Sequence, residues 1–499
     1  MHQGGGTTII GGHHDKRSPR VPPLPAAGSV VWLEQALVED PGEPCPPLAR
    51  SITADICVVG GGFTGLWSAI EVSERHPDVR VVLIEATACG FGASGRNGGW
   101  ASGWHDELDH MIDLFGVEPA LWLVDEAAAA IRRIGETCDE WGIRGFRQHG
   151  ALWAAAAPAQ LGAWDAALEA CRRHGRQDKL ELLAGDDVRR RTASPVLLGA
   201  ARQTDAAAVH PGLLVRGLRR VALARGVGIY EATPALGIDD GRPAVVRTPA
   251  GRVEAGAVIV ALGAWSGFLR RLRRAFVVVG SHIVATEPLG GAGVGPAFAD
   301  GELLCDAQRS VHYAQVSPDG RLVFGRGFGT IGWSSAPGPS HFADPGAVAR
   351  VAADLRRWFP ALASRELTHA WGGPVDRTPT HLPFVGTLGP AGNIHYGCGF
   401  SGNGVAPCAV VGKVLAAVAT GADEPAAHCA LTGGPRAWLP PEPFRTAGGA
   451  VVRRAVVAAD DAEACGRRAP PAGRALRRLA TFSLPAPFGQ FRYGARQRR

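Results

Sequence analysis

The chain has 499 residues, of which 46% are hydrophobic and 20% are charged, and its formal net charge is +6. These values are typical of a globular protein with one large or two smaller domains, and they exclude a mainly disordered chain. The basic excess is local, because residues 436–499 hold thirteen arginines against four acidic residues. The body of the chain is therefore not basic, and we expect no nucleic-acid partner.

Neither a metal site nor a disulfide framework is predicted, because the ten cysteines are scattered without a CxxC pair. Residues 1–20 lack the apolar centre of a secretory signal. No apolar run approaches the roughly eighteen residues that a membrane span needs. We therefore expect a cytoplasmic protein without a transmembrane segment.

Residues 54–85 carry the clearest motif. An apolar run ends in Gly60-Gly61-Gly62-Phe63-Thr64-Gly65, a helical pattern follows, and a second apolar run ends at Glu85. In such a unit Gly60 allows a tight turn, Gly62 lets the backbone approach a pyrophosphate, and Gly65 lets the helix pack on the strand. Glu85 is placed to hydrogen-bond ribose hydroxyls. The stretch predicts a dinucleotide-binding βαβ unit.

Two further glycine clusters follow, at residues 89–100 and 393–407. In the first, Ser94, Arg96 and Asn97 can donate to a phosphate or to ring carbonyls, although a flexible loop is the alternative. The second precedes an apolar helix whose N-terminus favours negative charge. A buried strand also reaches Gly263, at the edge where such sheets touch ligands. Contacts so far apart in the sequence need a long, flat ligand, and FAD fits.

The remaining patterns predict helices at residues 118–141, 158–173 and 211–225, with strands at 145–155, 227–230 and 257–262. From residue 276 to 371 the pattern is rich in strands, at 277–286, 310–316 and 322–328, which indicates a mixed or antiparallel sheet. Its alternation puts Tyr313 and Gln315 on one face and His312 on the other, without showing which face meets a substrate. His105, Asp109 and His110 do not all share a helix face, so ordinary packing is favoured over metal binding.

The expected fold class is α/β with an α+β second domain: a Rossmann-like FAD-binding domain and a substrate domain with a mixed or antiparallel sheet. We assign residues 51–140, 205–270 and 372–425 to the FAD-binding domain, and residues 141–204 and 271–371 to the substrate domain. Residues 1–50 form a partly disordered extension, and residues 426–499 form a basic one. Within the basic extension, residues 450–468 predict an amphipathic helix that lies on the protein or contacts a partner or a membrane surface.

Residues 60–65 with Glu85, together with residues 92–99, 285–288, 322–325 and 399–407, resemble the D-amino-acid oxidase superfamily of FAD-dependent oxidoreductases. The run Ser-Gly-Arg-Asn-Gly-Gly at 94–99 is most similar to the gamma-glutamylputrescine oxidoreductase branch. The resemblance implies a two-domain flavoenzyme that takes a hydride from a carbon bearing an amine, giving an imine that water hydrolyses. The predicted FAD contacts are Gly60, Gly62, Phe63, Thr64, Gly65, Glu85, Ser94, Gly95, Arg96, Asn97, Gly98, Gly263, Gly399, Phe400, Ser401, Gly402, Asn403, Gly404 and Val405.

The resemblance also sets expectations for the chemistry. The flavin N5 accepts the hydride, and the helix beginning near Val405 stabilises negative charge at N1 and the C2 carbonyl, so no catalytic triad is expected. Substrate-side candidates are His312, Tyr313, Trp371 and Arg377. Residues 371–377 lack the cysteine with which sarcosine-oxidase-like relatives tether their flavin, so we expect noncovalent FAD. The substrate is a small amine or amino acid.

The sequence leaves the electron acceptor and the class of flavoprotein open. Lysine occurs only at Lys16, Lys179 and Lys413, so a lysine that promotes reaction with oxygen is not evident, and the electron acceptor is oxygen or another carrier. A hydroxylase-type flavin monooxygenase normally has a Gly-Asp pair before its last glycine cluster, and residues 396–399 have none. A non-catalytic nucleotide-binding protein would be colourless when pure.

Overall fold

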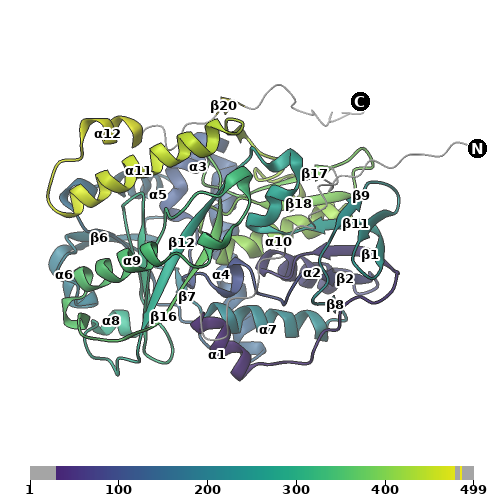
Figure 1. The fold of residues 1–499 in the computed structure, drawn as a ribbon, viewed down its shortest axis with the longest axis horizontal. Coiled ribbons are helices and arrows are strands. Elements are labelled where there is room, and N and C mark those ends of the chain that lie inside the picture. The colour runs from purple at the N-terminus through teal and green to yellow at the C-terminus, as the bar shows by residue number, and fades with distance from the viewer. Residues whose placement is uncertain (1–29, 478–483, 486–499) are drawn as a thin grey trace, which may run out of the picture.

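The computed structural model describes residues 30–477, 484 and 485. The expected tail at residues 1–20 and the end of the basic extension lie outside the described residues. Within them, two eight-stranded sheets organise the chain (Figure 1).

The first sheet is mainly parallel. Its central order is β17-β18-β11-β1-β2-β8, in which β1 pairs in parallel with both β11 and β2, while β17 is an antiparallel edge strand. The buried apolar residues of β1 and β11 suit strands that are covered on both faces. The strands are β1 Ile52–Val59, β2 Val81–Ile84, β8 Gly228–Tyr230, β9 Gly237–Asp239, β10 Ala244–Arg247, β11 Arg252–Val260, β17 Phe384–Leu388 and β18 Ile394–Cys398.

The second sheet is mainly antiparallel, with the order β16-β12-β15-β14-β13-β4-β6-β5 and a parallel pairing between β13 and β4. It is thus the mixed sheet that the sequence predicts. Its strands are β4 Ala151–Ala155, β5 Leu180–Ala184, β6 Gly199–Gln203, β12 Val277–Thr286, β13 Leu303–Asp306, β14 His312–Val316, β15 Leu322–Arg326 and β16 Leu367–Arg377.

Helices cover the sheets and fill the space between them (Figure 1). The helices are α1 Val31–Glu39, α2 Phe63–Arg75, α3 Leu108–Phe115, α4 Val117–Glu140, α5 Asp165–Arg173, α6 Gly185–Thr192, α7 Pro211–Ala224, α8 Pro296–Ala299, α9 Pro345–Trp358, α10 Val405–Thr420, α11 Phe444–Ala464 and α12 Pro471–Arg477. None of those in the described part of the chain is both long enough and apolar enough to span a bilayer.

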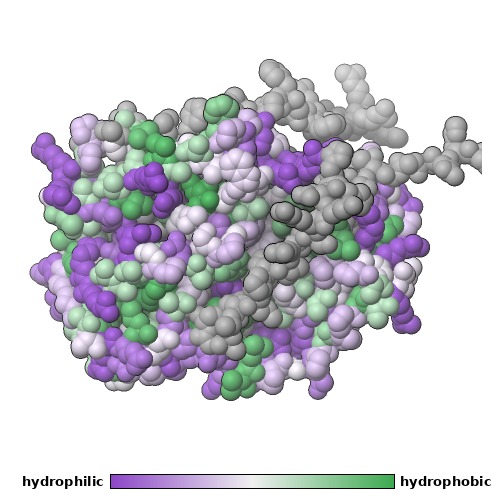
Figure 2. Space-filling model, viewed as in Figure 1, coloured by the Kyte–Doolittle hydropathy of each residue, from purple (hydrophilic) through white to green (hydrophobic). Residues whose placement is uncertain are grey.

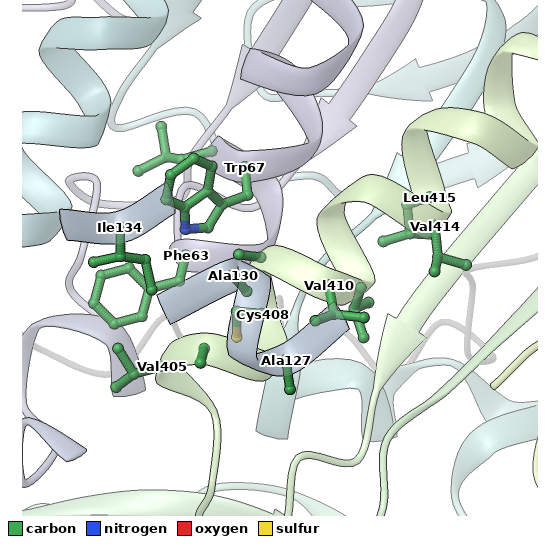
Figure 3. Packing of buried hydrophobic residues seen from close by; sticks show 14 of the residues in the cluster. Phe63, Trp67, Ala127, Ala130, Ile134, Val405, Cys408, Val410, Val414 and Leu415 are labelled. Carbon is green, nitrogen blue, oxygen red and sulfur yellow. The ribbon is translucent and has the colours of Figure 1, made fainter. Parts of the chain in front are cut away.

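The packing of α2, α4 and α10 brings two glycine turns together. Figure 3 shows Phe63 and Trp67 of α2 among apolar side chains of α4 and α10. Helices α2 and α10 approach closely, because a Cβ built at Gly412 would lie 2.6 Å from the Cβ of Trp67. At the start of both helices, the Thr64 hydroxyl donates to the Cys408 sulfur at 3.1 Å. The N-termini of α2 and α10 therefore open on the same region.

Some expected elements differ from the observed ones. Instead of one helix at residues 158–173, a short 3₁₀ turn at Pro158–Gln160 is followed by Gly162 at φ +83°, which interrupts the helix before α5 begins. Of the strand expected at 145–155, residues 151–155 form β4, and Arg147 makes only an isolated bridge with Ala208. Helix α11 lies on the second sheet, as its amphipathic pattern allows: the carboxylate of Asp460 accepts from the backbone and the hydroxyl of Ser310.

The strands of the first sheet fall within the residue ranges expected for an FAD-binding domain, and most of those of the second fall within the substrate ranges. Strand β16 is the exception, because it begins in the substrate range and runs past residue 372. The division into two domains stays a prediction.

Candidate cofactor and substrate site

The first glycine turn joins β1 to α2. A Cβ at Gly60, where φ is +112°, would lie 2.4 Å from the carbonyl oxygen of Ala261, and one at Gly65 would lie 1.9 Å from that of Gly60. These two glycines are therefore required by backbone packing. A Cβ at Gly62 would instead meet the Ser94 hydroxyl at 2.9 Å, in the space between α2 and the second glycine cluster. That space is where a pyrophosphate at the helix N-terminus is expected.

Glu85 follows β2 and lies beside this turn. Its carboxylate accepts from the backbone N–H groups of Gly61 at 2.8 Å and Thr87 at 3.0 Å. Burial raises the pKa of Glu85, and these backbone donors oppose that shift. A carboxylate has about four acceptor positions, so capacity remains for the ribose hydroxyls that the motif predicts.

The second glycine cluster is held largely by its own side chains. The backbone N–H of Phe63 donates to the Ser94 hydroxyl at 2.8 Å, which ties the cluster to α2. The Asn97 side chain donates to the carbonyls of Ala93 and Ser94 and accepts from the N–H of Gly99.

The guanidinium of Arg96 is buried under this cluster. It donates to the carbonyl oxygens of Phe91, Gly92 and Gly372, and it lies beside the stacked rings of Phe91 and Phe342, 5.1 Å from the centre of each. Burial lowers the pKa of Arg96 to about 10. The side chains of Arg96 and Asn97 thus shape the backbone, and direct contact of either with the cofactor stays a prediction.

The third glycine turn joins β18 to α10. Gly399, Ser401 and Gly402 all have positive φ, at +90°, +57° and +102°. Asp376 of β16 holds the turn: its carboxylate accepts from the N–H of Gly399 at 2.5 Å, and its carbonyl accepts from the N–H of Ser401 at 3.2 Å. The end of the second sheet is therefore attached to the turn that precedes α10.

The two faces of β14 are distinguished by the structure. The Gln315 side chain donates to the Gly98 carbonyl at 2.7 Å, and a Cβ at Gly98 would lie 2.7 Å from the Tyr313 ring. The Tyr313 hydroxyl is 2.8 Å from that of Ser281, and burial raises the pKa of Tyr313 to about 12. This face meets the second glycine cluster.

His312 lies on the other face of β14, away from the second glycine cluster, and its role on the substrate side stays a prediction. Its Nδ1 lies 2.8 Å from Asp306 and its Nε2 lies 3.1 Å from Asp354 of α9, with the Trp358 ring beside it. The alternation along a strand places it on the face covered by α9. Burial lowers the pKa of His312, but the two carboxylates outweigh that effect and raise it.

Trp371 is also enclosed. It is 2% exposed, its indole N–H donates to the Arg96 carbonyl at 2.8 Å, and its ring packs edge-on against Trp32 of α1. The structure therefore places Trp371 beneath the second glycine cluster, where it supports the backbone.

Arg377 ends β16, next to the third turn. Its guanidinium lies 3.0 Å from Nε2 of His381 and 5.0 Å from the centre of the Phe328 ring. Burial, assisted by the positive charge of Arg309, lowers the pKa of Arg377 to about 10. Burial together with the same cations lowers the pKa of His381 to about 3, so this imidazole is neutral at pH 7.

Glu107, at the end of the short turn His105–Glu107, is an acidic group near enough to Arg377 for their charges to interact. Burial, followed by Asp106 and Asp109, raises the pKa of Glu107 to about 8, and Arg377 opposes that shift. Nearby, His110 Nε2 lies 3.0 Å from the Thr380 carbonyl, whereas His105 faces Asp205. The sequence analysis did not identify Glu107 or His381. Glu107 is far from Arg377 in the sequence, whereas His381 follows Arg377 by four residues, a spacing that could have indicated their contact.

The first sheet carries a βαβ glycine turn at its carboxyl edge, and the second sheet is attached to the third glycine turn, before α10. Together these features define a dinucleotide-binding enzyme fold of the flavoprotein kind. A family model described as FAD dependent oxidoreductase (DAO) matches residues 55–418. The chain belongs to this family, and its cofactor is FAD. The predicted family and fold class are confirmed.

Sequence relatives agree with this assignment, and solved structures agree with the fold. The chain is 31% identical to gamma-glutamylputrescine oxidoreductase of Escherichia coli over 382 residues, covering 76% of this chain and 86% of the relative. It is 32% identical to a probable oxidoreductase, OrdL, of Rhizobium meliloti over 412 residues, covering 80% and 90% of the two chains. The crystal structure of glycine oxidase from Geobacillus kaustophilus matches with a TM-score of 0.61 at 21% identity, covering 74% of this chain and 96% of that one.

The described residues fit FAD at both ends of the site. Gly62 leaves the space between α2 and Ser94 that a side chain would fill. At the third turn, the buried Oδ1 of Asn403 has no hydrogen-bond donor among the described residues, and an isoalloxazine ring carries an N–H group that can supply one. Residues 60–65 with Glu85 would hold the adenosine diphosphate portion, and residues 399–405 the ring.

We expect FAD to be released intact by heat or acid. Cys89, Cys398 and Cys408 are the thiols beside the glycine turns, and burial raises the pKa of each, to about 12 for Cys408, so none is a ready nucleophile. After acid precipitation the yellow colour should appear in the supernatant. Flavin that stays with the precipitated polypeptide would contradict noncovalent binding.

Proposed function

We propose that the protein oxidises the carbon–nitrogen bond of an amine or amino acid, giving an imine that water hydrolyses to a carbonyl compound. When bound, FAD supplies the hydride acceptor. Membership of the DAO family supports this proposal, as does the similarity to a gamma-glutamylputrescine oxidoreductase and a glycine oxidase.

The observation that carries the proposal is the position of Arg377. In strand β16 it shares a face with Val375, whose Cγ1 lies 3.8 Å from a Cβ built at Gly402 of the third glycine turn. This face of the strand meets the region assigned to the flavin ring. A guanidinium binds a carboxylate through a planar pair of donors. Arg377, with Arg309 near it, would orient a substrate that carries a carboxylate as well as an amine.

The other groups shape the reaction site. The neutral imidazole of His381 accepts from Arg377 and keeps that side chain directed. The N-terminus of α10, with the backbone of residues 401–404, presents the positive end of a helix dipole to negative charge that develops on the ring. The protein then accelerates the oxidation by orienting the substrate and excluding water, and no side-chain nucleophile is needed.

The test is an assay of the purified holoenzyme with an artificial electron-accepting dye and a panel of amines, with and without a carboxylate. We expect dye reduction together with formation of a carbonyl product and release of an amine or ammonia. Dye reduction by a nicotinamide cofactor alone would instead indicate the monooxygenase class.

Glu107 should make the stability of the protein depend on pH. Its pKa is raised from 4.5 to about 8, so between these values the folded protein binds more protons than the unfolded chain, and the free energy of unfolding falls as pH rises. Replacing Glu107 with Gln removes this ionisation. The decline in melting temperature from pH 6 to pH 9 should become smaller by about 2 °C.

The matched control for this experiment is Glu136→Gln, which changes an exposed glutamate on α4. It should leave the pH dependence of the melting temperature unchanged. Equal slopes for Glu107→Gln and the unchanged protein would show that Glu107 ionises normally.

The electron acceptor is oxygen or another carrier. Lys413 pairs with Glu126 at 2.7 Å and Lys179 with Asp178 at 3.3 Å, so these two lysines are committed to carboxylates. Because neither is then free to promote reaction of the flavin with oxygen, another electron carrier is favoured as the acceptor. We also infer a cytoplasmic location, which the ten free cysteines support.

A further inference from the structure

A cavity lies between helix α11 and the second sheet, outside the residues assigned to FAD. Its volume is about 260 Å³, and it is lined by the end of β15, by α9 and by α11. In Figure 1, α11 is the long yellow helix, and the surface in that part of Figure 2 mixes hydrophilic and hydrophobic patches.

Four arginines line this cavity: Arg326, Arg350, Arg453 and Arg454. The one carboxylate in the lining, Asp461, is already engaged, because its Oδ1 accepts from Arg326 at 2.7 Å. Arg326 also pairs with Asp354 at 2.9 Å. The charge of Arg326 is therefore balanced within the protein.

The other three arginines are not balanced in this way. Among the described residues, Arg453 donates only to a backbone oxygen, that of Phe328, at 3.5 Å. Within residues 30–477, Arg350 and Arg454 have no carboxylate within ion-pairing distance. Burial lowers the pKa of Arg453, the like charges of Arg350 and Arg454 add to that effect, and the carboxylate of Asp344 opposes it. Three guanidinium groups thus line one concave surface, and their like charges favour an anion there.

We propose that this cavity binds a small multivalent oxyanion, such as the phosphate group of a small molecule or a tricarboxylate. A guanidinium presents its donors in a planar fork that matches phosphate and carboxylate oxygens. Three such groups match an ion with two or more negative charges better than a single carboxylate. The cavity volume accommodates an ion of this size with adjoining atoms.

The experiment is calorimetric titration of the FAD-loaded protein with inorganic phosphate, pyrophosphate and citrate, each at constant ionic strength, with chloride as the reference salt. We expect saturable binding of at least one of the three. Tighter binding of phosphate or pyrophosphate indicates a phosphate site, and tighter binding of citrate indicates a tricarboxylate site. The double variant Arg350→Gln/Arg454→Gln should weaken that binding by tenfold or more, since a hydrogen bond to a charged group typically contributes about that factor.

Arg356→Gln is the matched control, because Arg356 is an exposed arginine on α9 that does not line the cavity. It should bind the anion as the unchanged protein does. Loss of binding in this control, unchanged binding in the double variant, or no saturable binding by any of the three anions would each overturn the proposal. Both substituted side chains are exposed, and equal melting temperatures of the variants in chloride confirm that folding is intact.

Discussion

Replacing Gly62 with valine should yield a folded protein that is purified without flavin, with its affinity for FAD reduced by about a hundredfold or more, equivalent to about 2.7 kcal/mol. The added side chain fills the space between α2 and Ser94, and its nearest obstacle is the hydroxyl of Ser94 rather than backbone. The fold can therefore adjust while the pyrophosphate position is lost. The measurement is the ratio of flavin to protein absorbance, followed by titration with FAD.

The choice of Gly62 over Gly65 matters for this test. A Cβ at Gly65 would meet the Gly60 backbone at 1.9 Å, so a substitution there disrupts the βαβ unit itself. Gly448→Ala is the control: it lies in α11 with no atom within 4 Å of the added Cβ, and alanine favours a helix. Full flavin content in Gly62→Val would show that the cofactor does not approach this turn.

Arg377→Gln should lower kcat/KM for a substrate that carries a carboxylate by about ten- to a hundredfold, because a hydrogen bond to a charged group contributes about 1.5–3 kcal/mol. An amine without a carboxylate should be affected much less, since it makes no such contact. The measurement is steady-state kinetics with one substrate of each kind. The flavin content should stay full.

The outcome that would contradict this role is an equal loss for both kinds of substrate, which would indicate general damage at the third turn. Arg356→Gln again serves as the control, because it removes a guanidinium from an exposed position on α9. Its kinetics should match those of the unchanged protein.

Much of the fold could be predicted because its signals are local. Strand β12 runs over residues 277–286 as expected, and Glu85 follows β2 at the edge where a ribose-binding acid is required. The glycines were informative for the same reason: Gly60 and Gly65 are dictated by contacts that adjoin them in the chain or the sheet.

The substrate side could not be predicted in the same way, because it depends on contacts between distant segments. Alternation along β14 separated Tyr313 from His312 but could not show which face α9 covers. The sequence suggests that Arg96 donates hydrogen bonds to a phosphate, yet its guanidinium donates to the carbonyls of Phe91 and Gly372. Glu107 and Arg377 are brought near each other only by the tertiary fold.

A chain that holds FAD and oxidises amines with it should transfer electrons from an amine to the flavin. The most direct measurement is anaerobic mixing of the purified protein with a panel of amines and amino acids while the visible absorbance of the flavin is followed. We expect a yellow protein whose absorbance is bleached by at least one member of the panel, with a carbonyl product formed in proportion. Colourless protein that cannot be reconstituted with FAD, or flavin bleached by a nicotinamide cofactor and by no amine, would contradict the account.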